Sequence, residues 1–153
     1  MIHIASAGVA DLEKLIDLED RLFPVDRLSS RQLRYLLTRA NGFVLKAEQQ
    51  GRLVGTMVLL KRKRSGKLRI YSLGVAREAR KQGIARKLLR HAETTASACG
   101  CSMLTLEVCE HNQAAIKLYR MSGFSPVGRK DNYYEDGCTA LQMKKTLNLE
   151  DVP

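Results

Sequence analysis

The stretch from Val75 to Arg86, V-A-R-E-A-R-K-Q-G-I-A-R, joins a predicted strand to a predicted amphipathic helix through a basic turn. The first backbone amides of a helix have no partner within the helix, and the helix dipole adds positive potential at that end. Such an end is a natural site for a pyrophosphate group, and Gly83 removes the side chain where phosphate oxygens would approach. The Walker pattern (G-x-x-x-x-G-K, then Ser or Thr) and the dinucleotide pattern G-x-G-x-x-G are both absent. The stretch predicts an anion site outside those two classes, with a purely structural turn as the alternative.

A second stretch, from Leu106 to Phe124, carries the residues best suited to proton transfer. A helix that begins near Asn112 aligns Asn112, Ala115 and Tyr119 on one face. On the preceding strand, Glu107 points away from the face of its apolar neighbours. A carboxylate one strand away from a phenol suits a proton acceptor and donor pair. Each of the two residues also has a purely structural interpretation: Glu107 as a solvent-facing glutamate, and Tyr119 as a packed tyrosine.

Hydrophobic periodicity sets these two stretches within an alternation of helices and strands. Helical spacing predicts helices over 11–22, 29–39, 84–99 and 112–121, and other apolar segments predict strands over 43–48, 53–61, 67–75, 103–109, 124–127 and 139–144. With a first strand at the N-terminus, the order is β-α-α-β-β-β-α-β-α-β-β, which predicts an α+β fold with a mixed sheet. Asp11 is a candidate cap of the first helix, and Ser29 or Ser30 of the second. No repeat or linker divides the chain, so one domain is expected over 1–153.

The composition is that of a globular protein with a large excess of positive charge. The chain has 153 residues, 44% of them hydrophobic, and lacks an apolar run of 18 residues or an N-terminus that resembles a signal peptide. A cytoplasmic protein without membrane association is therefore expected. The formal net charge of +10 favours anionic partners. The densest basic run, the basic hairpin 61–69, is expected to be a solvated hairpin tip. The alternative is a binding site for the ribosome or another anionic partner.

The four cysteines are expected to be small apolar core residues. A zinc site built from Cys99, Cys101, Cys109 and His111 would have a spacing that is not one of the usual structural patterns, so no metal is expected. No secretory context supports a disulfide framework. Catalysis in which the Cys109 thiol acts as a covalent nucleophile is a minor alternative.

Taken together, the two stretches resemble the GNAT superfamily of N-acetyltransferases. Its signature, Arg or Gln followed by x-x-G-x and then Gly or Ala, matches residues 80–85, R-K-Q-G-I-A. Its downstream pattern N-x-x-A-x-x-x-Y-x-x-x-G-F matches Asn112, Ala115, Tyr119, Gly123 and Phe124. The resemblance covers nearly the whole chain. It implies a single-domain GNAT fold, in which a mixed, mostly antiparallel sheet of about seven strands is combined with about four helices.

The resemblance also implies acetyl-CoA as co-substrate and assigns residues to its binding. The residues expected to contact it are Leu73, Gly74, Val75, Arg80, Lys81, Gln82, Gly83, Ile84, Ala85, Arg86, Asn112, Ala115 and Tyr119. In this mechanism a neutral amine attacks the thioester directly, with Glu107 as general base, through water, and Tyr119 as general acid. A backbone amide near Val75 could stabilise the oxyanion.

Within the superfamily, the chain is most similar to the ribosomal-protein alanine N-acetyltransferase branch. L-E-V at 106–108 and R-K-D-N-Y-Y-E-D-G at 129–137 carry this similarity, which implies a protein or peptide N-terminal α-amino group as acceptor. The residues expected to shape the acceptor groove are Phe23, Asp26, Arg27, Tyr133 and Tyr134. The segment after Phe23-Pro24 departs from the branch pattern, which leaves ribosomal-protein identity of the acceptor open.

Three other functions stay open from the sequence: acetylation of a small amine or a lysine side chain, a non-catalytic acetyl-CoA sensor, and a nucleic-acid-binding module built on the basic hairpin. The protein is expected to be a monomer or a homodimer.

Overall fold

A computed structural model describes residues 1–23, 26–39 and 41–147, and the element order is the one that periodicity predicts. The elements are β1 (Ile2–Ser6), α1 (Leu12–Leu22), α2 (Ser30–Thr38), β2 (Gly42–Gln49), β3 (Arg52–Lys61), β4 (Lys67–Val75), α3 (Ile84–Ala98), β5 (Met103–Cys109), α4 (Gln113–Met121), β6 (Ser125–Lys130) and β7 (Ala140–Thr146), with short 3₁₀ turns at Val9–Asp11 and Arg77–Ala79. Predicted and observed ends differ by at most two residues except in β6, which extends three residues further. None of the described helices is long and apolar enough to cross a membrane.

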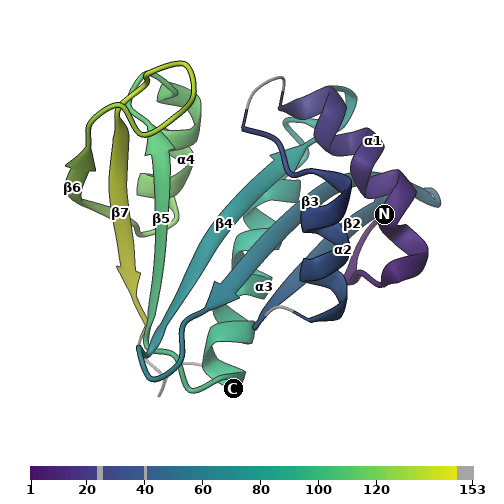
Figure 1. The fold of residues 1–153 in the computed structure, drawn as a ribbon, viewed down its shortest axis with the longest axis horizontal. Coiled ribbons are helices and arrows are strands. Elements are labelled where there is room, and N and C mark those ends of the chain that lie inside the picture. Colours follow the sequence, from purple (N-terminus) through teal and green to yellow (C-terminus); the bar gives the residue numbers. More distant parts are fainter. Residues whose placement is uncertain (24–25, 40, 148–153) are drawn as a thin grey trace.

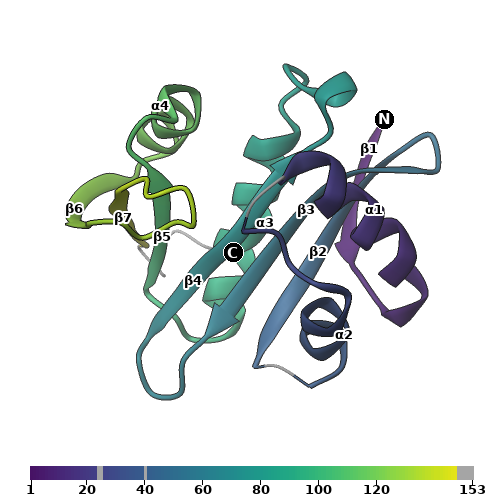
Figure 2. The same ribbon diagram turned by 45° about the horizontal axis from the view of Figure 1, so that its top comes forward.

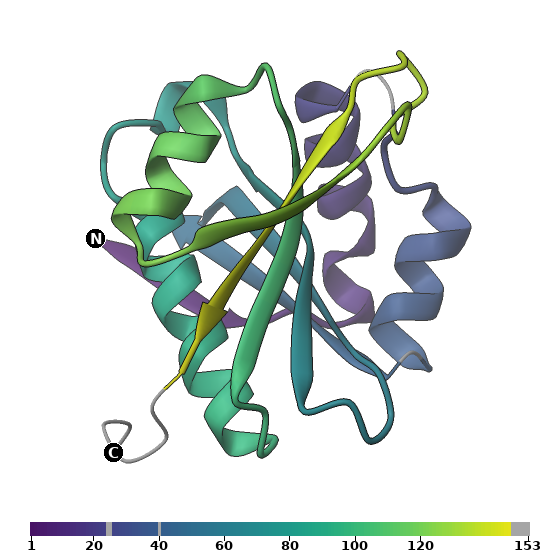
Figure 3. The ribbon, with the colours of Figure 1, turned by 90° about the vertical axis from the view of Figure 1, so that its left-hand side faces the viewer.

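The strands form one seven-stranded sheet in the order β1-β2-β3-β4-β5-β7-β6. All neighbouring pairs are antiparallel except β4 and β5, which are parallel. The helices α3 and α4 lie on one face of the sheet, and α1 and α2 lie on the other (Figure 3). The described chain thus has the mixed, mostly antiparallel sheet and the four α-helices that were predicted.

Each face of the sheet has its own hydrophobic core. The α3 face buries the predicted apolar stripe of that helix, namely Ile84, Leu88, Leu89, Ala92 and Ala96. A second, smaller cluster under α1 and α2 consists of Leu12, Leu15, Leu28, Leu33, Val44 and Val58. Because successive side chains of β2 and β3 point to opposite faces, these strands contribute to both cores.

The strands β4 and β5 pair over only four residues and then diverge. Lys67–Ile70 lies beside Met103–Leu106, and no further pair joins the two strands (Figures 1 and 2). A bulge lies at the same point, because Val58 of β3 is opposite Ser72 and Leu59 is opposite Ile70, which leaves Tyr71 between them. A bulge bends and twists its strand, so it turns the C-terminal half of β4 away from β5.

The capping prediction was right for α2, whereas at α1 Asp11 occupies the predicted N-cap position without a side-chain cap bond. Ser29 Oγ accepts from Gln32 N at 3.1 Å, and Gln32 Oε1 accepts from Ser29 N at 2.8 Å, which completes a capping box. Asp11 makes no side-chain bond to α1. Its carboxylate accepts from Gly8 N at 2.9 Å and contacts Lys46 Nζ at 3.0 Å, because the 3₁₀ turn before α1 directs it backwards.

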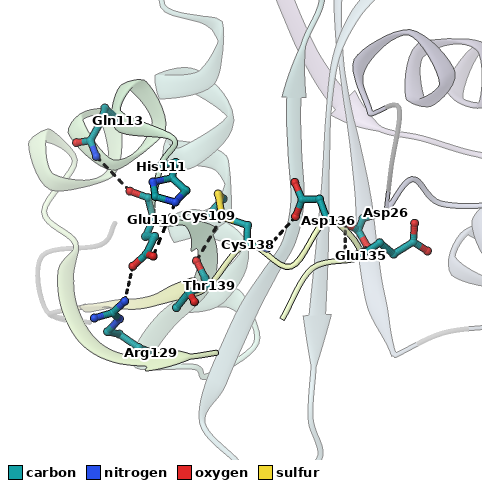
Figure 4. The surroundings of a disulfide bond; sticks show 10 residues. All are labelled: Asp26, Cys109, Glu110, His111, Gln113, Arg129, Glu135, Asp136, Cys138 and Thr139. Atoms are coloured by element: carbon teal, nitrogen blue, oxygen red, sulfur yellow. Dashed lines mark hydrogen bonds and ion pairs between the residues drawn. A yellow bond between two sulfur atoms is a disulfide. The ribbon is translucent and has the colours of Figure 1, made fainter. Parts of the chain in front are cut away.

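The cysteine prediction was wrong for two of the four residues. Cys109 and Cys138 form a disulfide across 29 residues of sequence (Figure 4). The β5–β7 register explains the pairing, because it sets Cys109 opposite Ala140, two residues after Cys138. Cys101 is fully buried, as expected of a core residue, and Cys99 is partly buried. While the disulfide is formed, Cys109 offers no thiolate to a zinc ion or to a covalent route.

Candidate active site

A cavity of about 230 Å³ lies where the 75–86 stretch meets α4. Its lining residues are Val75, Ala79, Arg80, Lys81, Gly83, Ile84, Ala85, Arg86 and Leu118. Gly83 is the N-cap of α3 with φ +80°, and Lys81 also has a positive φ of 66°. Left-handed residues within a turn direct backbone amides into one concavity, which together with a helix N-terminus favours an anion. A methyl group on Gly83 would meet no protein atom within 4 Å, so the space beside this glycine is open.

Not every predicted cofactor residue faces this cavity. Arg80 Nε donates to Val75 O at 3.1 Å, which holds the guanidinium at the end of β4. Gln82 Oε1 accepts from Gln49 Nε2 at 2.7 Å, so this side chain is directed toward β2 rather than into the cavity. Asn112 caps α4, since its Oδ1 accepts from Ala115 N at 3.2 Å. Leu73, Gly74 and Tyr119 lie outside the lining, whereas Leu118, which sequence reasoning missed, belongs to it.

The C-terminal half of β4 borders the gap left by the divergence of β5. In an antiparallel pair, alternate residues turn their N–H and C=O groups away from the partner strand. Leu73, Gly74 and Val75 are paired with β3 on one side, so part of their backbone is directed toward the side that β5 has left. A Cβ on Gly74 would lie 2.7 Å from Leu22 Cδ1 and 3.0 Å from Phe23 Cζ. The predicted acceptor residue Phe23 therefore packs directly on β4 at this point.

Glu107 lies on the partly buried face of β5 with both carboxylate oxygens held by cations. Arg69 Nε contacts Oε2 at 3.2 Å, Arg69 Nη2 contacts Oε1 at 3.1 Å, and Lys130 Nζ lies 3.5 Å from Oε1. Arg69 Nη2 also donates to the Tyr133 hydroxyl at 2.7 Å. Sequence reasoning assigned Arg69 to the basic hairpin, and only the parallel β4–β5 register, which sets Arg69 opposite Thr105, brings it to Glu107.

Tyr119 is buried in α4, 8% exposed, with its ring edge-on to Phe124 at 5.7 Å between centroids. Burial raises the pKa of the Tyr119 hydroxyl to about 12. The phenol therefore remains protonated at neutral and moderately alkaline pH, as a proton donor must.

Tyr133 and Tyr134, the residues of the β6–β7 loop predicted to shape the acceptor groove, lie close to these groups. Burial raises the pKa of the Tyr134 hydroxyl, and the neighbouring Tyr133 and the charge of Glu107 raise it further, as do Tyr119 and Asp26 more weakly. Tyr134 therefore lies within electrostatic reach of both proposed catalytic residues. Tyr133 stacks edge-on against Tyr134, with 4.9 Å between centroids.

The loop between α1 and α2 approaches the same place. Asp26, with φ +58°, accepts from the backbone N–H of Glu135 at 3.3 and 3.4 Å through its two oxygens (Figure 4). Arg27 is instead directed back to α1, where its Nε lies 3.3 Å from Asp20 Oδ1. Pro24 and Val25, which complete the predicted acceptor segment, lie outside the described residues.

A family model described as the acetyltransferase (GNAT) family matches residues 12–124. The chain belongs to the GNAT family. It is 31% identical to the N-alpha-acetyltransferase RimI of Mycobacterium tuberculosis, over 94% of this chain and 92% of that protein. It is 34% identical to the mycothiol acetyltransferase of Jonesia denitrificans, over 59% of this chain but only 29% of that protein. The crystal structure of the ribosomal-protein-S18-alanine N-acetyltransferase from Escherichia coli superposes with a TM-score of 0.86 at 24% identity, covering 97% of this chain and 95% of that one, which shows a shared fold.

Enzymes of the GNAT family use acetyl-CoA, and the residues of this chain fit that molecule. The open space at Gly83, the small Ala85 and the cationic side chains around the cavity suit a pyrophosphate. Among the described residues, no three His, Cys, Asp or Glu side chains are arranged to hold a metal ion.

Proposed function

We propose that this enzyme transfers acetyl from acetyl-CoA to the N-terminal α-amino group of a protein or peptide. One observation carries the proposal: the divergence of β4 from β5 lies between the cavity at 75–86 and the side chains that gather around Glu107. Acetyl-CoA that extends from the cavity and an acceptor that extends from the Glu107 side would meet between the two strands. The similarity to an N-alpha-acetyltransferase over 94% of the chain supports an α-amino acceptor. A cytoplasmic location, in one catalytic domain formed by 1–153, is part of this proposal.

Bound acetyl-CoA supplies an activated acetyl thioester, and the chain supplies binding, orientation and proton transfer. Residues 73–75 offer backbone groups to an extended ligand, and residues 80–86 with the start of α3 hold its phosphates. An amide near Val75 is the candidate donor to the oxyanion. Asn112, Ala115 and Gln82 have structural contacts of their own, so we assign them a supporting role.

Proton transfer is assigned to Glu107 and Tyr119. An α-amino group has a pKa of roughly 8, so a large fraction is protonated at neutral pH and must lose its proton before it attacks. Glu107 accepts that proton through water, since Arg69 and Lys130 already contact both carboxylate oxygens. Tyr119 Oη holds a proton that it can give to a departing thiolate, consistent with its pKa of about 12.

The acceptor groove is assigned to loops that meet over Glu107. Phe23 packs on Gly74, and we assign the other side of the groove to Tyr133, which Arg69 links to Glu107, and to its neighbour Tyr134. Asp26 joins the two loops through Glu135 N, which gives it a role in shaping the groove. Arg27, paired with Asp20, is assigned a role at the rim.

Two measurements test the proposal. Calorimetry should give saturable one-to-one binding of acetyl-CoA that is weakened by Gly83→Glu; no binding at millimolar ligand contradicts it. A mass-spectrometric screen of peptides that differ at the first residue should then find an acceptor, with a small amine and a lysine side chain as competing substrates. Tyr119→Phe and Glu107→Gln should each lower kcat by about 10²-fold or more. If both variants turn over like the unmodified enzyme, the catalytic assignment is wrong.

The basic hairpin supports an accessory contact with the ribosome or another anionic partner. Lys61 Nζ donates to Cys99 O at 3.2 Å and Arg69 is bound to Glu107, so these two are used within the fold. Arg62, Lys63 and Arg64 are exposed at the turn between β3 and β4. Binding to RNA that weakens steeply with salt would support this contact.

A further inference from the structure

The disulfide lies at one end of the loop that carries the acceptor tyrosines. This loop, 131–139, connects β6 to β7 and contains Tyr133 and Tyr134. Cys138 joins it to Cys109 at the last residue of β5 (Figure 4). Cys109 is two residues after Glu107 and on the same face of the strand. One covalent bond therefore connects the strand of the proposed base to the loop of the proposed acceptor groove.

Local hydrogen bonds transmit the position of Cys138 to Tyr134. Tyr134 N donates to Cys138 O at 3.3 Å, and Gly137 N donates to Tyr134 O at 2.8 Å, so residues 134–138 form a tight turn. Cys138 N donates to Asp136 Oδ1 at 2.9 Å within the same turn. Movement of Cys138 would therefore move Tyr134.

The other described polar contacts of the loop tip, residues 131–137, lie near its exposed surface. They are the Asp26 contact to Glu135 N, the Arg69 contact to the Tyr133 hydroxyl and Lys130 Nζ over the Tyr133 ring at 5.2 Å. The Tyr134 side chain is only partly buried, and the bond from Glu110 N to Thr139 O at 3.0 Å holds the chain beside Cys138 rather than the tip. Single exposed contacts of this kind contribute little and exchange with water. Without the disulfide, these contacts have to hold the loop against the conformational entropy of its backbone.

Building on the proposed function, we propose that Cys109 and Cys138 are positioning residues for the acceptor, and that the redox state of their bond sets acceptor affinity. A dithiol reduces the bond by thiol–disulfide exchange: its two thiols become a cyclic disulfide, and Cys109 and Cys138 each become a thiol. A low-molecular-weight disulfide reverses the exchange and restores the bond. Both cysteines are partly exposed, so such reagents can reach them.

The effect is expected on the acceptor and not on acetyl-CoA. The cavity at 75–86 includes no residue of the 131–139 loop. Reduction releases one end of the loop and removes its preorganisation for the acceptor, which must then order the loop when it binds. The acceptor KM is expected to rise about tenfold on reduction. The dissociation constant of acetyl-CoA is expected to stay within about twofold, because its site keeps all of its contacts.

The test compares oxidised and reduced protein, using the peptide acceptor found in the screen. Alkylation and intact mass count the thiols: two in the oxidised protein, Cys99 and Cys101, and four after dithiothreitol and desalting under nitrogen. Product is read by mass spectrometry, because a thiol reagent would react with released coenzyme A and with the protein. Cys138→Ser should have the high acceptor KM in both conditions, and Cys99→Ser should respond to reduction like the unmodified protein.

Three outcomes overturn the proposal. They are four alkylated thiols after treatment with oxidised glutathione, an acceptor KM that is the same in both redox states, and a dissociation constant of acetyl-CoA that changes as much as the acceptor KM. If no acceptor is turned over in either state, the proposed function is in doubt, and hydrogen exchange then tests the loop directly. Amides of 134–138 should exchange about tenfold faster after reduction, as expected when local structure opens more readily. Equal exchange rates would refute the positioning role.

Discussion

A buried glutamate beside the loop between α1 and α2 should make the stability of this enzyme depend on pH. Glu19 in α1 is 2% exposed. Its Oε2 accepts from Leu28 N at 3.3 Å, and its Oε1 has no hydrogen-bond partner in the described part of the chain. Burial raises the pKa of Glu19 from 4.5 to about 6; the Leu28 amide lowers it, and the charge of Asp20 adds a small increase.

The sign of the effect follows from which state binds the proton more tightly. Below pH 4.5, both the folded and the unfolded protein hold the Glu19 proton, and burial costs nothing extra. As the pH rises from 4.5 to 6, the unfolded chain ionises first, so the free energy of unfolding falls. At about 1.4 kcal/mol per pH unit, the contribution of Glu19 falls by about 2 kcal/mol and stays low above pH 6.

Glu19→Gln removes this titration and keeps a carbonyl oxygen for Leu28 N. The free energy of unfolding, from urea denaturation at intervals between pH 4.5 and 8, should converge for the two proteins at the acid end. At pH 7 to 8 the variant should be more stable by about 2 kcal/mol. Glu13→Gln, on the exposed side of the same helix, is the matched control and should follow the unmodified protein. Curves for Glu19→Gln and the unmodified protein that stay parallel across the whole range would refute the reasoning.

Three further predictions concern the cofactor turn, the proposed acid and the disulfide. Gly83→Ala should lower the free energy of unfolding by about 1–2 kcal/mol because of its φ of +80°. Calorimetry should also show that this variant binds acetyl-CoA more weakly. The control Gly100→Ala, with φ +73° at the other end of α3, should have the same strain and unchanged binding. Because its pKa is raised to about 12, Tyr119 should cause no falling limb in kcat between pH 9 and 10.5, and a limb near pH 10 that disappears in Tyr119→Phe would contradict this. Cys138→Ser should lose about 3–4 kcal/mol of stability, since a disulfide across 29 residues restricts the unfolded chain; denaturation with and without dithiothreitol should show that this difference from the unmodified protein vanishes on reduction.

The sequence alone determined the element order, nearly all element ends and the family. These features depend on local physics: the three- and four-residue spacing of apolar side chains in α3, the alternation in β5, and the glycine that ends or begins a helix. The turn at 80–86 could be assigned to anion binding because its amides and its glycine act within a few residues of one another. The capping box of α2 has the same local origin, since its two partners are three residues apart.

Tertiary structure alone decided the contacts between residues far apart in the chain. Arg69 and Glu107 are 38 residues apart, and only the short parallel register of β4 and β5 brings them together. The bulge at Tyr71 and the divergence beyond it have no signal in either strand by itself, because both depend on the partner strand. The Cys109–Cys138 disulfide follows from the β5–β7 register, which neither the spacing nor the number of cysteines reveals. Strand register is set by the packing of the whole sheet, so the sequence could suggest candidate catalytic side chains but not the residues that position them.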